Sequence, residues 1–203
     1  MFKKIAADAL GLSDIGIVVP STDFDKTDSD DFIFDEINEK IYFLIKTKSD
    51  EYCFTNYAFI HVDGESAVSK KRLLCRYDYE FHTINNVFLE TAGTIDLDVE
   101  IKFTINNEAF SIDIHKKYLN EIKNLYKSLH AISTEQKHNA YKLKVAEDSI
   151  QLAANAVGRS GNEVAPVNSF EQITKFANDW LIEKKETYRK KDFSSTFELY
   201  INK

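Results

Sequence analysis

The chain has 203 residues, enough for one large domain or two small ones with a buried core. Its apolar content of 43% and aromatic content of 13% are typical of globular proteins and exclude a disordered chain. The formal net charge of −7 argues against general binding of nucleic acid or of an anionic membrane. No run of about 18 apolar residues is present, so we expect no membrane span and a cytoplasmic protein.

Residues 1–36 are predicted to combine a short helix with an acidic connector. Phe2, Ile5 and Ala9 have helical spacing, and Asp8 interrupts the apolar run, which argues against a signal peptide. We expect the apolar face of this helix to pack either on its own chain or on a partner. Residues 20–40 carry eight carboxylates, and we expect a solvated connector there.

Residues 40–114 predict a block of seven antiparallel strands, because short apolar runs alternate with turn signals. The expected strands are residues 41–45, 51–54, 57–62, 72–77, 87–91, 94–103 and 109–114. The sixth is the clearest, since five apolar residues alternate with polar ones: Ile95, Leu97, Val99, Ile101 and Phe103. Cys53 and Cys75 lie inside strand patterns, which is typical of small buried hydrophobic residues.

The period then changes to that of a helix. One apolar stripe predicts a single helix that caps the strand block: Leu119, Ile122, Leu125, Tyr126, Leu129 and Ile132. Ser133 and Gln136 have the spacing of a capping box, and Ser169 and Gln172 repeat it. An apolar repeat of helical spacing follows each box: Leu143, Ala146, Ile150, Ala153 and Val157 after the first, and Ile173, Phe176, Ala177, Trp180 and Leu181 after the second. Gly158, Gly161 and Pro166 lie between the two repeats, so we expect an antiparallel helical hairpin. The tail alternates like a short strand at Phe197, Leu199 and Ile201.

Several segments of the strand block resemble the bacterial pleckstrin-homology (PH) family. They are Phe54-Thr55-Asn56, Phe59-Ile60-x-Val62-Asp63-Gly64, Lys70-Lys71, and the long motif that runs from Glu90-Thr91-Ala92-Gly93 to Asp96-Leu97-Asp98-x-Glu100-Ile101-Lys102. The hairpin after residue 133 resembles the extension of the YvbH-like members of that family. The resemblance implies an α+β fold, with a PH-like seven-stranded antiparallel barrel or sandwich capped by one helix. It also implies homo-oligomers without enzymatic activity.

We therefore predict four parts of the chain. Residues 1–36 hold the short helix and the connector, 37–132 the PH-like domain, 133–192 the helical hairpin, and 193–203 a tail. Phosphoinositide binding is a property of eukaryotic PH domains, and the fold alone does not transfer it to this chain.

No pattern of catalytic, cofactor-binding or metal-ligating residues is found in the sequence. The five histidines lack metal-ligand spacing, and no nucleophile elbow, phosphate loop or dinucleotide-binding pattern is present. We therefore expect no catalytic residues, no cofactor and no metal. The favoured function is a non-enzymatic interaction module that assembles with copies of itself, with room for other protein partners and no role in nucleic-acid binding.

A basic patch supports an alternative function, the binding of lipid headgroups at a membrane surface. The candidate residues for this anion or lipid site are Lys46, Lys48, Lys70, Lys71 and Arg72. Ordinary charged turns explain the same residues, and the acidic net charge favours that explanation.

Two further groups are candidates for the oligomer interface. Asp96, Asp98 and Glu100 share one strand face, and a metal site, contact with lysines of a neighbouring subunit, and a solvated face are the alternatives. The other group is the apolar stripe of the second hairpin helix: Ile173, Phe176, Trp180 and Leu181. A two-helix unit has little core of its own, so this stripe is expected to pack on the barrel or on another subunit.

Overall fold

The computed structural model describes residues 15–64, 72–91, 98–159 and 167–201, with the backbone alone for 157–159 and 167–170. The predicted N-terminal helix, Lys70, Lys71 and Asp96 lie outside these residues. The chain divides into two compact units. One contains Met1–Ser133 and Lys191–Lys203, and the other contains Thr134–Lys190.

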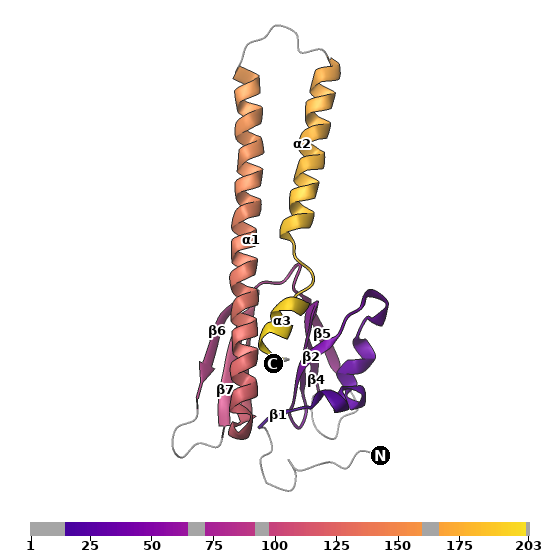
Figure 1. Ribbon diagram of the computed structural model, residues 1–203, viewed down its shortest axis with the longest axis vertical. Helices are drawn as coiled ribbons and strands as arrows, with labels where there is room; N and C mark the ends of the chain where they lie inside the picture. The colour runs from indigo at the N-terminus through magenta and orange to yellow at the C-terminus, as the bar shows by residue number, and fades with distance from the viewer. Residues whose placement is uncertain (1–14, 65–71, 92–97, 160–166, 202–203) are drawn as a thin grey trace. The chain divides into compact units, whose positions relative to one another are not determined.

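Two antiparallel sheets form the first unit (Figure 1). The five-stranded sheet contains, in spatial order, β1 (Ile17–Val18), β2 (Ile41–Lys46), β3 (Glu51–Thr55), β4 (Ala58–Asp63) and β5 (Leu73–Asp78). The three-stranded sheet contains β6 (Ile84–Glu90), β7 (Asp98–Ile105) and β8 (Glu108–His115). The α+β fold and its antiparallel strands are confirmed, with β1 as an additional strand and without a closed barrel.

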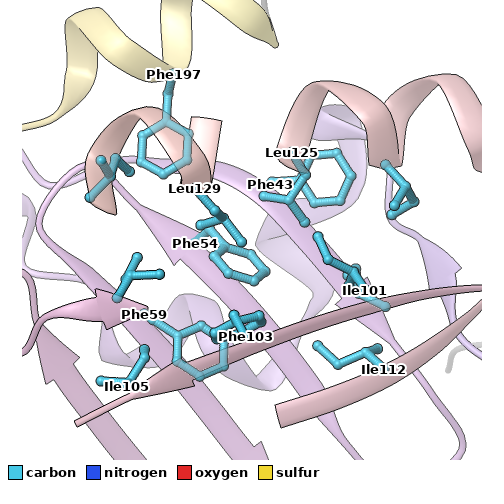
Figure 2. Packing of buried hydrophobic residues seen from close by; sticks show 14 of the residues in the cluster. Phe43, Phe54, Phe59, Ile101, Phe103, Ile105, Ile112, Leu125, Leu129 and Phe197 are labelled. Atoms are coloured by element: carbon cyan, nitrogen blue, oxygen red, sulfur yellow. The ribbon is translucent and has the colours of Figure 1, made fainter. Parts of the chain in front are cut away.

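The core of this unit lies between the inward faces of the two sheets and the first part of a long helix. The predicted alternation of β7 is confirmed, because Val99, Ile101 and Phe103 are buried. Phe54 and Phe59 meet Phe103 with ring centroids 5.9 and 5.2 Å away, as Figure 2 shows from close by. The predicted helical stripe completes this core with four buried residues: Ile122, Leu125, Leu129 and Ile132.

The helix that caps the sheets does not end at residue 132. Helix α1 (Leu119–Arg159) is continuous over 41 residues, so the prediction of a new helix at the Ser133 capping box is wrong. Ser133 is itself buried within the helix. Residues 119–157 contain neither Gly nor Pro, so nothing in the backbone stops the helix there.

The C-terminal tail is helical, which corrects the predicted strand. Helix α3 (Ser194–Tyr200) buries Phe193 and Phe197 in the main core. These two residues are four apart, as one helical face requires, whereas Leu199 is exposed. Asp192 supports the start of the helix, because its carboxylate accepts a hydrogen bond from the Ser194 N–H at 2.7 Å.

Residues 21–37 form a segment that we call the acidic strap. It consists of three short 3-10 helices, η1 (Ser21–Lys26), η2 (Asp28–Phe32) and η3 (Asp35–Ile37). Phe24 and Ile33 pack on the face of the five-stranded sheet opposite the main core, against a second buried cluster: Val19, Leu44, Cys53, Ala58, Ile60 and Val62. The segment predicted to be a solvated connector therefore packs, with one side, on the five-stranded sheet.

Two buried carboxylates of the first unit hold the strap and the residues that follow it. Glu51 accepts hydrogen bonds from the backbone N–H and the hydroxyl of Ser29 at 2.8 and 2.7 Å. Glu39 accepts from the Thr55 hydroxyl at 2.6 Å and from the Arg76 guanidinium at 3.1 Å. Buried charge is tolerated in proteins only with such partners, so these contacts fix the course of the strap.

The Phe-Thr-Asn motif has a structural role at the turn between β3 and β4. The Thr55 hydroxyl accepts the Ala58 N–H at 2.8 Å, and the Asn56 side-chain carbonyl accepts the Lys40 N–H at 2.8 Å. The Asn56 amide also donates to Asp192 at 3.3 Å, which ties the turn to the residues before α3. These hydrogen bonds join segments that are distant in the sequence. They also occupy the polar side chains of the motif with partners inside the protein.

The second unit is a hairpin formed by residues 134–159 of α1 and by α2 (Val167–Tyr188). The predicted antiparallel arrangement agrees with the pairing of Lys190 with Glu135 at 3.0 Å, because these residues lie at the far ends of the hairpin sequence (Figure 1). Lys142 also lies over the Tyr188 ring at 5.9 Å.

Candidate interaction surfaces

Two of the three described cations of the predicted basic patch are paired with carboxylates. Lys46, at the end of β2, forms an ion pair with the buried Glu51. Arg72, just before β5, lies 3.2 Å from a carboxylate oxygen of Asp28 in the acidic strap. Lys48 is exposed in the turn after β2. Because Lys46 and Arg72 already balance acidic groups, they offer less charge to an anionic ligand than the sequence predicts.

The acidic face of the three-stranded sheet contains a row of carboxylates. Glu100 of β7 is in register with Glu90 on β6 and with Asp113 on β8. Lys102 forms ion pairs with both Glu90 and Glu100, at 3.0 and 2.8 Å. Of the predicted acidic triplet, Asp98 and Glu100 are placed on this face.

The electrostatics of this row differ along its length. The pKa of Glu100 is lowered, chiefly by its hydrogen bond with Lys102 and next by the one from Ser111. The pKa of Asp113 is raised, first by burial and then by the charges of Glu100 and Asp98. Lys102 therefore forms ion pairs with the carboxylates of β6 and β7 on this face, and not with Asp113 on β8.

An open hollow of about 650 Å³ borders the same sheet. Its floor and walls come from β6, β7 and the first part of α1, and they mix apolar and charged side chains: Val87, Phe88, Leu89, Glu90, Lys102 and Tyr126. Phe88 is exposed at its rim. The sequence did not predict this hollow, because its lining comes from three separate elements.

The predicted apolar stripe of the hairpin is divided between two environments. Trp180 and Leu181 are half-buried, whereas Ile173 and Phe176 are exposed, Phe176 by 68%. Ala146 is the one buried side chain among the described residues of the hairpin. The hairpin therefore has almost no core of its own.

A second exposed apolar group lies on the α1 part of the hairpin. Tyr141 and Leu152 are 71% and 70% exposed, and Val145 is exposed between them. The spacing i, i+4, i+11 places the three residues on one helical face. Leu143, Ala146 and Ile150 of the predicted repeat lie on another side of this helix and are buried or half-buried. A second stripe at Tyr141, Val145 and Leu152 is the signal in the sequence that could have predicted the exposed face.

The polar groups that could support chemistry are dispersed. Within the described part of the chain, no three His, Cys, Asp or Glu side chains come together as a metal site. His61 stacks on Tyr52 with centroids 4.7 Å apart, and its Nε2 lies 3.3 Å from Asp50. Cys53 is buried beneath the acidic strap, and burial raises the pKa of its thiol.

Among the described residues, no helix combines the length and the apolar character that a membrane crossing requires.

Known proteins resemble this chain along its whole length. Residues 9–133 match the family described as Bacterial PH domain, and residues 144–203 match the YvbH-like oligomerisation region. The uncharacterized protein YvbH of Bacillus subtilis (strain 168) is 51% identical over 203 residues, which cover 100% of both chains. A crystal structure of a PH domain containing bacterial protein from Exiguobacterium sibiricum 255-15 is 44% identical with a TM-score of 0.85, and the match covers 93% of this chain and 100% of that one. The chain therefore belongs to the bacterial PH domain family and carries a YvbH-like oligomerisation region.

Proposed function

We propose that this protein is a non-enzymatic interaction module that self-associates through its helical hairpin. The observation that carries the proposal is the exposure of Phe176, Tyr141 and Leu152 on a unit in which only Ala146 is buried among the described residues. The PH-like fold supports the module, and the match to an oligomerisation region supports the hairpin as its contact.

The physical argument rests on what an isolated helical hairpin lacks. Helices in proteins gain most of their stability from packing an apolar face, and two helices alone bury little. Large apolar side chains that remain exposed on both helices favour association, since burying one of them contributes about 1.5–3 kcal/mol. A second copy presents the same apolar faces, so contact between hairpins buries these residues on both sides.

The proposal predicts that charged substitutions on the hairpin reduce the solution mass. Phe176→Glu combined with Leu152→Glu places carboxylates in the proposed contact, where an unpaired buried charge is costly. Leu73→Glu combined with Phe81→Glu is the matched control, because both side chains are comparably exposed, belong to the first unit and lie outside the matched oligomerisation region. Light scattering after size-exclusion chromatography should show a smaller mass for the hairpin variant and an unchanged mass for the control. An unchanged mass in the hairpin variant would overturn the hairpin contact.

A further inference from the structure

The outward side of the acidic strap combines negative charge with large apolar side chains. Six carboxylates are exposed within twelve consecutive positions: Asp25, Asp28, Asp30, Asp31, Asp35 and Glu36. Phe32, Phe34 and Ile37 are exposed among them. A segment that merely connects two elements has no need to expose two phenylalanines and an isoleucine.

These apolar side chains are presented from a fixed backbone. The Arg76 guanidinium lies 4.5 Å from the centre of the Phe34 ring, and the Phe34 N–H donates to Glu39 at 3.0 Å. The Tyr57 hydroxyl donates to the Ile37 carbonyl at 3.0 Å. A partner that binds here therefore meets groups already in position, which lowers the entropic cost of association.

The described ion pairs of the strap involve two of its carboxylates. Asp28 pairs with Arg72, and Asp23 with Lys26. The pKa of Asp30 is raised, first by burial and then by Asp35, Asp25 and Asp31, so these carboxylates repel one another. Cationic groups from outside the strap would relieve this repulsion.

We propose that the outward face of the acidic strap binds a cationic amphipathic segment of another protein. Lysine and arginine side chains of the partner pair with the carboxylates, and its apolar side chains cover Phe32, Phe34 and Ile37. Inorganic cations make no use of the apolar groups, and nucleic acids and anionic membranes are repelled by the carboxylates. This binding is independent of the hairpin contact proposed above.

The probe is a fluorescent amphipathic helical peptide made of lysine and leucine, titrated into the full-length protein and followed by fluorescence anisotropy. Two control peptides carry glutamate in place of lysine, or serine in place of leucine. We expect the lysine–leucine peptide to bind more tightly than either control, and to bind more weakly as salt is raised. Failure of this peptide to bind at low salt would overturn the proposal.

Variants then locate the binding face. Phe32→Ser with Ile37→Ser should weaken binding about tenfold or more, which corresponds to one buried anchor. Asp31→Asn with Asp35→Asn and Glu36→Gln should weaken binding and reduce its salt dependence. A control with the same change of charge on the hairpin should leave binding unchanged: Glu171→Gln, Asp179→Asn and Glu186→Gln.

Two outcomes contradict the proposal even when the peptide binds. If the strap and hairpin charge variants lost peptide affinity equally, the peptide would be attracted by the net charge of the protein alone. A change in solution mass in the strap variants without a change in peptide binding would show that a second copy of the chain, and not a different protein, covers the strap. Thermal unfolding of each variant confirms that it is folded.

Discussion

Arg76 compensates a buried charge, and its removal should destabilise the first unit. Its guanidinium lies 3.1 Å from Glu39 and 2.7 Å from Asp78. Arg76→Met would leave the Glu39 carboxylate buried without a cation, at a cost of about 3 kcal/mol in unfolding free energy measured by urea denaturation. The control is Lys144→Met, which breaks the exposed pair with Asp148 and should leave the unfolding free energy nearly unchanged. Similar losses in both variants would contradict this role of Arg76.

Tyr52 should make stability depend on alkaline pH. Burial, with smaller contributions from Asp50, Asp63 and Asp113, raises its pKa to about 12. The folded state holds this proton more tightly than the unfolded state, whose tyrosine pKa is about 10. The stabilisation is therefore complete below about pH 10 and is lost as the pH rises through about 12.

Replacement of Tyr52 tests this dependence directly. Tyr52→Phe should reduce the fall in unfolding free energy between about pH 9 and about pH 11.5, measured by urea denaturation at each pH. A variant whose stability falls with pH as steeply as that of the natural chain would show that other groups carry the alkaline loss.

The pairing of single residues shows where sequence reasoning reaches its limit. Lys46 and Arg72 are basic in the sequence, but their partners Glu51 and Asp28 are selected by the fold, 5 and 44 positions away. Sequence spacing does not reveal such tertiary pairs, so it could not show that Lys46 and Arg72 of the predicted basic patch are paired with carboxylates.

At the scale of elements, the continuity of α1 is open to a direct test with proline. If Ser133 capped a new helix, Thr134 would occupy its first position, where proline is tolerated. In the continuous helix, residue 134 is interior, and Thr134→Pro should cost about 3 kcal/mol in unfolding free energy. Thr134→Ala, as the control, should be close to neutral, and a proline variant as stable as this control would support two separate helices.

The elements also differ in how far the sequence predicted them. Strand β7 was predicted well because one face is buried and the other is wet, which produces a clear period of two. Helix α3 was not, because in so short a segment Phe197, Leu199 and Ile201 fit alternation, while the helical pair of Phe193 and Phe197 needs the core to be recognised. The 3-10 helices of the acidic strap have no repeating apolar pattern, and tertiary packing alone defines them.

At the scale of the whole molecule, the two units differ in how much apolar surface they bury, and the function proposed for the hairpin follows from this difference. Among the described residues, the first unit buries one cluster of nineteen and covers the outer face of its five-stranded sheet with the acidic strap. The hairpin leaves Phe176, Tyr141 and Leu152 exposed. The sequence predicted the hairpin and, of these three residues, only Phe176 as a candidate contact. Solvent exposure depends on the packing of the two helices and could not be read from periodicity alone.

The solution mass of the full-length protein tests the central claim most directly. Self-association through the hairpin predicts a discrete multiple of 23.4 kDa by size-exclusion chromatography with light scattering, stable over a wide range of concentration. A mass of 23.4 kDa at every concentration would contradict self-association.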